Sequence, residues 1–529
     1  MKRVISLTLS LTLIASLTAG CGSANDKKSA TTSSPTTSSI EYKGTGPITD
    51  NKSAKLTILA TNSYYTNADL SQAEIIKEVV KRSGVNVEWQ LLPPGNYQDA
   101  IAPRLAAGSA LPDIIKLPDM DPTMKYINGK LFVPIDSYYE KFGVNLKKLY
   151  NGEYAGLKAS LTTPDKKMYY IPQIGLGKEY QPYFMVNMRW LNNVGLKEPT
   201  TIDEFTNMLK AFRNNDPNKN GKQDEIPLSI EKGYIGKSFG PMFGLDLESR
   251  FFADKSGKVH FSYFEAAYKD YLTYLNSLYK QGLLDPDFAT TTRDQKISRF
   301  AKDITGATFD YSWQMSQSYS NQFKDYDGKT PIVKGIAPVK NINGDQYYVG
   351  RNVGTGIFGI SRDCKDPELA FKFLDFAISD EAQTLYNWGV EGVTYNVVDG
   401  KKVYTDKGKD NDFIQKYGIN PVNMPSIQST AMAEGILPAW HVQVDKQISP
   451  MVKAPWPAVY SLPEEASVES QYLTDLNTYI DEMEMKFILG TESLANFDKY
   501  KDKLKNMHVD ELLKVRQAQY DRYVASSKK

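Results

Sequence analysis

Between residues 55 and 115, the spacing of apolar residues alternates between the two-residue period of a strand and the 3.6-residue period of a helix. Residues 55–60 form a short run of strand-forming side chains, and residues 85–89 and 112–115 form two more. Helical spacing separates these runs, with one helix pattern ending at Gly84 and the next at Gly108. Strands that alternate with helices predict a parallel sheet with helices on its faces, so the predicted fold class is α/β.

Polar loops follow two of these predicted strands. Tyr64 lies in the loop of residues 61–67, and Asp119 lies in the loop after residue 115. In α/β sheets of this kind, ligands bind at the carboxyl ends of the strands. We therefore expect Tyr64 and Asp119 to contact a ligand.

The amino terminus predicts export. Lys2 and Arg3 precede an apolar run of about 16 residues, which is shorter than the roughly 20 residues of a bilayer-spanning helix. Residues 1–20 therefore have the pattern of a secretory signal peptide. The peptide Leu-Thr-Ala-Gly-Cys that ends at Cys21 resembles a bacterial lipobox, although a threonine takes the usual place of the leucine. We expect a lipid on Cys21, and a cleaved signal without lipid is the alternative.

The mature chain divides into a tether and a folded part. Residues 21–53 are rich in Ser, Thr, Lys and Gly and are predicted to bury too little apolar surface to fold. About 475 residues remain, which is more than one hydrophobic core usually holds, so two lobes are expected.

Cys364 has no partner once Cys21 carries a lipid, and we interpret it as a buried thiol. Longer helices are predicted at residues 201–212, 367–377 and 463–490.

Charge and motif content exclude some classes of function. The chain has 63 Lys and Arg and 62 Asp and Glu, a formal net charge of +1, so it lacks the basic character of a nucleic-acid-binding protein. The three histidines stand alone, without metal-ligand spacing, and no nucleophile or phosphate-loop motif is present. Paired carboxylates of a glycosidase leave no sequence motif, so a membrane-anchored glycoside hydrolase or lyase is the enzyme alternative.

An acidic loop has the spacing of a calcium site. Oxygen-bearing side chains occupy loop positions one, three, five and nine, and Gly221 occupies position six. Position twelve is Pro227 instead of the usual glutamate, so Glu225 at position ten would complete the shell. A solvated turn without metal is the alternative. The predicted ligands of a structural calcium ion are Asp216, Asn218, Asn220, Lys222 (through its carbonyl), Asp224 and Glu225.

Several aromatic residues lie in polar, turn-like segments instead of apolar stripes. Tyr169, Trp313 and Trp440 are examples. Sugar rings stack their C–H faces on flat aromatic groups and hydrogen-bond through their hydroxyls, so such residues favour a carbohydrate site. Packing in a hydrophobic core is the alternative for each tryptophan. Arg351 and Arg189 are candidate contacts for an acidic sugar.

The order of several short motifs resembles the extracellular solute-binding proteins of family 1, in particular the lipoproteins of the oligosaccharide branch, which includes alginate-binding proteins. The resemblance implies a two-lobed, periplasmic-binding-protein-like fold of type II with the ligand cleft between the lobes. The N-terminal lobe would hold residues 54–175 and about 353–410, and the C-terminal lobe about 176–352 and 411–529. The motifs are Pro112–Ile114, Lys167–Pro172, Trp190–Leu196, the loop at Asp216, Leu278–Asp287 and Glu368–Phe376.

The resemblance also implies a function without chemistry. The chain would be the lipid-anchored, solute-binding component of an ABC importer, capturing an oligosaccharide and delivering it to the permease subunits. It would be a monomer at the outer face of the bacterial cell membrane, held by an acyl lipid such as palmitate on Cys21. Ring-stacking contacts would come from Tyr169, Trp313 and Trp440. A sensory co-receptor that presents sugar to a membrane kinase is a further alternative.

Overall fold

The computed structural model describes residues 40–62, 69–93, 97–117, 123–152 and 154–527. The predicted signal peptide, Cys21, Tyr64 and Asp119 lie outside the described residues. Within these ranges, no helix combines the length and the apolar character needed to cross a bilayer.

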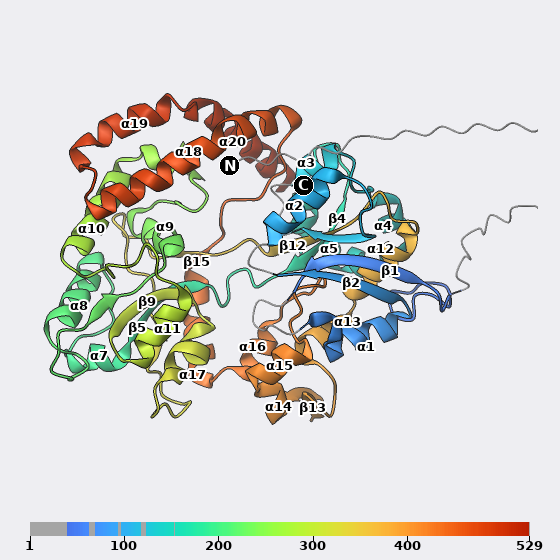
Figure 1. Cartoon of the computed structure of the whole chain (residues 1–529), viewed down its shortest axis with the longest axis horizontal. Helices are drawn as coiled ribbons and strands as arrows, with labels where there is room; N and C mark the ends of the chain where they lie inside the picture. Colours follow the sequence, from blue (N-terminus) through green and yellow to red (C-terminus); the bar gives the residue numbers. More distant parts are fainter. Residues whose placement is uncertain (1–39, 63–68, 94–96, 118–122, 153, 528–529) are drawn as a thin grey trace, which may run out of the picture. The chain divides into compact units, whose positions relative to one another are not determined.

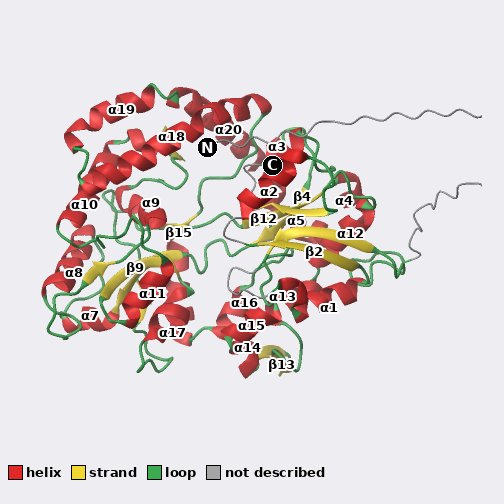
Figure 2. Ribbon diagram, viewed as in Figure 1, coloured by secondary structure: helices red, strands yellow, loops and turns green. Residues whose placement is uncertain are grey.

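The first sheet forms where the sequence alternates between strand and helix patterns (Figure 2). Its five strands have the order β2-β1-β3-β12-β4. As predicted, β1 is parallel to β2 and β3, but β12 is antiparallel to both β3 and β4. The sheet is therefore mixed, because β12 re-enters it from the side on which β4 leaves. The strands are β1 Lys55–Thr61, β2 Asn86–Leu92, β3 Ile114–Leu117, β4 Tyr170–Ile174 and β12 Gly354–Ile360.

Helices pack against this sheet and complete the first core (Figure 1). Gly84 ends α1 at a φ of 74°, a left-handed conformation that glycine adopts without strain. Ile76 and Val79 of α1 are fully buried against Ile58 of β1 and its neighbours. The helices are α1 Glu74–Ser83, α2 Tyr97–Ala107, α3 Thr123–Asn128, α4 Asp136–Phe142, α5 Val144–Asn151, α6 Ala155–Leu161, α12 Pro367–Ala377 and α13 Asp380–Trp388.

The first core includes residues on both sides of the predicted ranges, before residue 54 and after residue 410. Ile48 is fully buried, and the Tyr42 hydroxyl donates to Asp375 at 2.7 Å, so residues before 54 already pack on the first core. Ile414 and Met424 are buried in the same core. The later elements here are β13 Tyr395–Val398, β14 Lys401–Tyr404, α14 Asp406–Lys409, α15 Asn411–Tyr417 and α16 Thr430–Ile436.

The second sheet has four strands in the order β10-β5-β9-β6. Trp190 and Phe212 pack over Gly306 of β9, where a Cβ would stand 2.4 Å from the Phe212 ring and 2.8 Å from the Trp190 ring. This close approach of two buried rings to the strand requires glycine. The strands are β5 Pro182–Asn187, β6 Ile226–Leu228, β9 Thr305–Tyr311 and β10 Val333–Gly335.

The second core is completed mainly by helices, including those near the carboxyl terminus. The helices predicted at residues 201–212, 367–377 and 463–490 are present as α8, α12 and α18. The α18 helix packs on α10 and α20 (Figure 1). The elements are α7 Met188–Asn193, α8 Ile202–Asn214, α9 Ile235–Phe239, α10 Ala266–Lys280, α11 Arg293–Ala301, α17 Ala439–Ile448, α18 Pro463–Leu489, α19 Phe497–Lys505 and α20 Val509–Ser527, with the ribbons β7 Phe251–Ala253 to β8 Val259–Phe261 and β11 Tyr348–Val349 to β15 Val452–Lys453.

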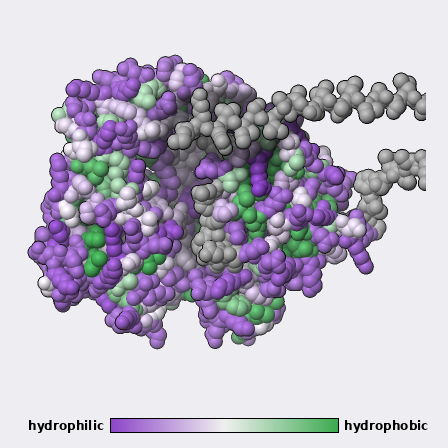
Figure 3. Space-filling view, viewed as in Figure 1, coloured by the Kyte–Doolittle hydropathy of each residue, from purple (hydrophilic) through white to green (hydrophobic). Residues whose placement is uncertain are grey.

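Two of the segments that join the cores run side by side, and we call them the two linking segments. Residues 175–181 lead from β4 to β5, and residues 350–353 lead from β11 to β12. The Gly175 amide donates to the Val353 carbonyl at 2.8 Å. A Cβ on Gly175 would stand 2.6 Å from the Thr355 side chain, so glycine permits this close contact. On the face that Figure 3 shows, hydrophilic residues dominate and hydrophobic ones form separate patches, as expected when most apolar side chains are packed inside.

Candidate functional site

A cavity of about 1510 Å³ lies beside the two linking segments. Residues 175–179 and 351–353 of these segments line it, together with Gly354, residues 427–430, 454–455 and 457–458. The α6 and α13 helices of the first core supply the remaining main wall. The cavity is large enough for a ligand bigger than a monosaccharide.

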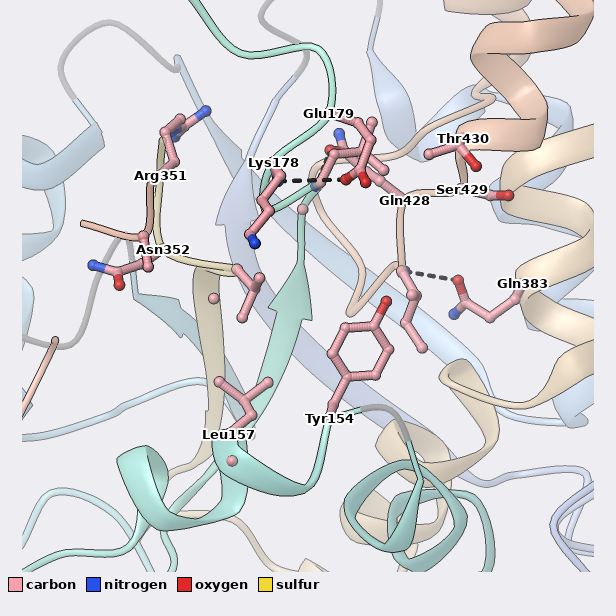
Figure 4. Close-up of a pocket in the computed structure, with 18 of the residues that line it drawn as sticks. Tyr154, Leu157, Lys178, Glu179, Arg351, Asn352, Gln383, Gln428, Ser429 and Thr430 are labelled. Atoms are coloured by element: carbon pink, nitrogen blue, oxygen red, sulfur yellow. Dashed lines mark hydrogen bonds between the residues drawn. The ribbon is translucent and has the colours of Figure 1, made fainter. Parts of the chain in front are cut away.

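Polar side chains occupy two sides of this cavity, and Tyr154 and Leu157 lie between them (Figure 4). Lys178, Arg351 and Asn352 lie on one side, on the linking segments. The opposite side carries amides and hydroxyls, from Gln383, Gln428, Ser429 and Thr430.

The amide side of the cavity is held by hydrogen bonds to the backbone. The side-chain oxygen of Gln383 accepts a hydrogen bond from the backbone amide of Ile427 at 2.7 Å. The Gln428 side chain accepts from the Leu176 amide at 3.3 Å, and the Gln428 amide donates to the Ile174 carbonyl at 2.8 Å. These amide groups are therefore preorganised, which lowers the entropy that ligand binding would cost.

Arg351 connects the cavity to the carboxyl end of β9. Its guanidinium lies over the ring of Tyr311, the last residue of β9, at 5.5 Å from the ring centroid. Burial is the main cause that raises the pKa of Tyr311, so this hydroxyl stays protonated at neutral pH. Trp313 follows two residues later. Arg351 and Tyr311 therefore form a cationic, aromatic corner beside the cavity.

A second aromatic group follows the linking segment at Glu179. The ring of Tyr180 lies 6.4 Å from that of His441, and the Trp440 ring lies 5.5 Å from His441. His441 is fully buried, with Ser316 Oγ 2.7 Å from Nδ1 and Asp445 Oδ2 3.2 Å from Nε2. This Ser-His-Asp order resembles that of a hydrolase, but Ser316 is 1% exposed, so the group serves packing and not nucleophilic attack.

The predicted ligand contacts differ in where the structure places them. Arg351 lines the cavity. Trp313 and Trp440 are partly buried, Trp440 against the second core, and Tyr169 is only 8% exposed and packs beside Tyr170. None of these three residues is among those that line the cavity. Arg189 lies elsewhere, paired with Asp325 at 2.7 Å.

Sequence reasoning missed most residues of the cavity wall. Lys178, Gln383 and Gln428 belong to no motif and come from three distant segments. One signal was available, because Gly175 and Gly177 stand close together between two strand-like runs. Paired glycines there indicate a place where two backbones approach closely.

The predicted calcium loop forms a tight turn with its oxygens directed inward. The Asp216 carboxylate accepts from the amides of Asn220 and Gly221, both at 3.0 Å. Glu225 is only 5% exposed, and one of its carboxylate oxygens has no hydrogen-bond partner among the described residues. Burial, together with the carboxylates of Asp224 and Asp216, raises the pKa of Glu225. A hard cation fits this excess of oxygen acceptors, although the described His, Cys, Asp and Glu side chains alone form no metal-binding group of three.

A buried lysine hydrogen-bonds to the segment that leads into the cavity wall. Lys116 of β3 is 3% exposed, and its ammonium nitrogen donates to the Val422 carbonyl at 2.6 Å. Gln173 of β4 donates to the Pro421 carbonyl at 3.3 Å and to Ser426 at 3.1 Å. These bonds fix the segment that continues into the cavity-lining residues 427–430. Burial lowers the pKa of Lys116 to about 7.

Comparisons with known proteins agree on one family and one fold. Residues 67–384 match the bacterial extracellular solute-binding proteins. The chain is 25% identical, over 99% of its length and 98% of the relative, to the fructooligosaccharide ABC transporter substrate-binding protein FusA of Streptococcus pneumoniae. It is 24% identical, over 81% of its length and 84% of the relative, to the polygalacturonan/rhamnogalacturonan-binding protein YtcQ of Bacillus subtilis. The crystal structure of alginate-binding protein AlgQ2 without calcium ion matches 89% of this chain and 98% of that chain, with a TM-score of 0.74 and 22% identity.

Lys116 makes stability depend on pH. The folded chain holds this lysine neutral above about pH 7, whereas the unfolded chain keeps it protonated until about pH 10.4. The unfolded state therefore binds more protons in this window, and the free energy of unfolding should rise as pH rises from 7 to 10. Lys116→Met should remove that rise of about 1.4 kcal/mol per pH unit, because the methionine side chain does not titrate.

Urea unfolding at several pH values measures this effect. Lys372→Met is the matched control, because Lys372 is also buried but is paired with Glu368 at 2.7 Å. The control should keep the wild-type slope. Parallel pH curves for Lys116→Met and the wild type would contradict the prediction.

Proposed function

The chain belongs to the bacterial extracellular solute-binding proteins, and we propose that it captures an oligosaccharide for an ABC importer. The observation that carries this proposal is the cavity of about 1510 Å³ beside the linking segments. Its wall combines amides, hydroxyls and the rings of Tyr154 and Trp388, which is the chemistry that recognises the hydroxyls and C–H faces of sugars. Two relatives have saccharides in their names, which supports the same substrate class.

Binding without chemistry follows from the family. Solute-binding proteins capture a ligand and do not convert it, so the chain is not an enzyme. The described carboxylates that line the cavity are Glu179 and Asp380, and Asp380 is paired with Lys148 at 2.6 Å. A glycosidase needs two carboxylates that flank one bond and titrate differently.

The two cores are the proposed lobes, and the linking segments are the proposed hinge. Core membership supports an N-terminal lobe that extends beyond residue 410 to about Ile436, because Ile414 and Met424 are buried in the first core and Ile436 packs against it. A sugar that contacts both lobes favours the closed arrangement and shifts the equilibrium towards it. The proposed sugar contact from the hinge is Arg351, and those from the second lobe are Trp313 and Trp440. In the first lobe, the proposed contacts are Tyr64 and Asp119.

Titration calorimetry with a panel of neutral and acidic oligosaccharides tests the binding proposal. We expect saturable binding without product, and a smaller radius of gyration by X-ray scattering when ligand is added. Gln428→Ala should weaken binding about 3- to 10-fold, the usual value of a neutral hydrogen bond. Gln281→Ala, an exposed glutamine on the second core, is the matched control and should bind normally.

Two results would count against this proposal. Cleaved sugars in the reaction mixture would indicate an enzyme, and scattering that stays constant at saturation would contradict lobe closure.

A calcium ion in the Asp216 loop is a second part of the proposal. The inward oxygens of the loop support it, as does the carboxylate oxygen of buried Glu225 that has no hydrogen-bond partner among the described residues. Two proteins of the same fold are described in terms of such a site, AlgQ2 as solved without calcium ion and FusA as an EF-hand mutant. Asp216, Asn218, Asn220, Asp224 and Glu225 would hold the ion through side chains, and Lys222 through its carbonyl. The loop lies outside the cavity-lining residues, so the ion would stabilise the second lobe and not contact sugar.

Chelation should therefore lower the melting temperature, and added calcium should restore it. A ligand at 100 times its dissociation constant stabilises the folded state by about 2.7 kcal/mol. Asp216→Asn should abolish the response to chelator. Asp254→Asn is the control, because Asp254 also caps a turn through the Ser256 amide, at 2.8 Å, and should leave the response intact. An identical melting temperature with and without chelator would rule out a stabilising ion.

A lipid on Cys21 is the third part of the proposal, supported by the signal peptide and the lipobox-like sequence. Cys21→Ser should move the protein from the membrane pellet to the culture medium, because the acyl chains are its only proposed attachment. Cys364→Ser is the matched control. Burial and Asp113 raise the pKa of the Cys364 thiol to about 12, so this thiol is unreactive and its loss should not release the protein. Wild-type protein found free in the medium would contradict lipidation.

A further inference from the structure

The cavity carries an excess of positive charge. Three cationic side chains line it, from Lys178, Arg351 and Lys402, against two carboxylates, from Glu179 and Asp380. Asp380 is already paired with Lys148, which lies outside the lining, at 2.6 Å. The whole chain has 63 basic and 62 acidic residues, so this local excess does not reflect the overall composition.

The three cations have no carboxylate partner among the described residues. Arg351 lies over the Tyr311 ring and Lys402 lies 6.0 Å from the Tyr395 ring centroid. Aromatic faces hold a cation in position without neutralising it. Such cations therefore remain able to pair with an anionic ligand.

The cations come from three separate segments of the chain that line the cavity. Lys178 and Arg351 lie on the two linking segments, on the side opposite the amide groups (Figure 4). Lys402 comes from the β13–β14 hairpin of the first core. A single small anion would need a cluster of cations at one point, whereas cations spread along a cavity of this size suit a ligand with repeated charges.

We propose that the solute is an acidic oligosaccharide, with Arg351, Lys178 and Lys402 pairing with its acidic groups. This inference rests on the proposed oligosaccharide function and specifies its substrate class. The names of the relatives do not decide it, because fructooligosaccharides are neutral and polygalacturonan is acidic. A planar carboxylate matches the guanidinium of Arg351 through two parallel hydrogen bonds.

The test compares acidic sugars with neutral sugars of the same shape. The full chain in detergent is titrated with trigalacturonate and trimannuronate, with their methyl esters, and with neutral kestose and maltotriose. We expect at least one acidic trimer to bind tenfold or more tightly than its ester, with an affinity that falls as salt rises. A sulfated trisaccharide in the series distinguishes sulfate from carboxylate as the preferred group.

Charge-removing variants locate the effect. Arg351→Gln should weaken binding of the acidic trimer about tenfold or more, as expected for hydrogen bonds to charged groups, and weaken binding of its methyl ester much less. Lys178→Gln should act in the same direction and provides a second test if Arg351→Gln does not fold. Lys210→Gln, which removes an exposed charge of α8 outside the cavity, is the matched control and should bind normally.

The outcomes separate this inference from the proposed function. Kestose or maltotriose binding without any binding of acidic trimers would overturn the acidic ligand and keep the oligosaccharide function. Equal affinities for acid and ester, or unchanged binding by both Arg351→Gln and Lys178→Gln, would also overturn it. Failure of every sugar to bind would contradict the proposed function itself.

Discussion

The insertion of β12 between β3 and β4 determines the layout of the rest of the chain. β12 follows β4 by about 180 residues, and the intervening residues supply most of the second core. Because β4 leaves the first sheet at the edge where β12 enters it, the two linking segments must run next to each other. The hydrogen bond from the Gly175 amide to the Val353 carbonyl and the absence of side chains at Gly175 and Gly177 make this possible.

The cavity is a consequence of the same arrangement. Adjacent linking segments bring Lys178 and Arg351 to one side of a space whose other side is made by α13 and residues 427–430. Buried polar contacts from Lys116 and Gln173 keep that second side in place. Leaving such groups buried is costly unless they are hydrogen-bonded, so they fix the backbone that they contact.

Several expectations from the sequence were confirmed because they depended on neighbouring residues. The alternation of strand and helix patterns predicted β1, α1, β2 and β3, and the capping sequence at Thr201 predicted the start of α8. Other features were missed for the opposite reason. The buried residues around Ile48 lie in a polar stretch, and they pack only because the first core offers a surface for them. The antiparallel entry of β12 depends on a pairing between segments far apart in the chain.

The sequence by itself determined the strand and helix pattern and the spacing of the Asp216 loop, and it predicts a signal for export, since each of these depends on residues within a few positions of one another. Only the tertiary structure decided which side chains meet in the cavity. Lys178, Arg351, Gln383 and Gln428 are separated by up to 250 residues, so no local pattern relates them. The packing of the two cores also decides that Lys116 is buried and loses charge near pH 7, because burial is a property of the whole fold and not of the sequence around the residue.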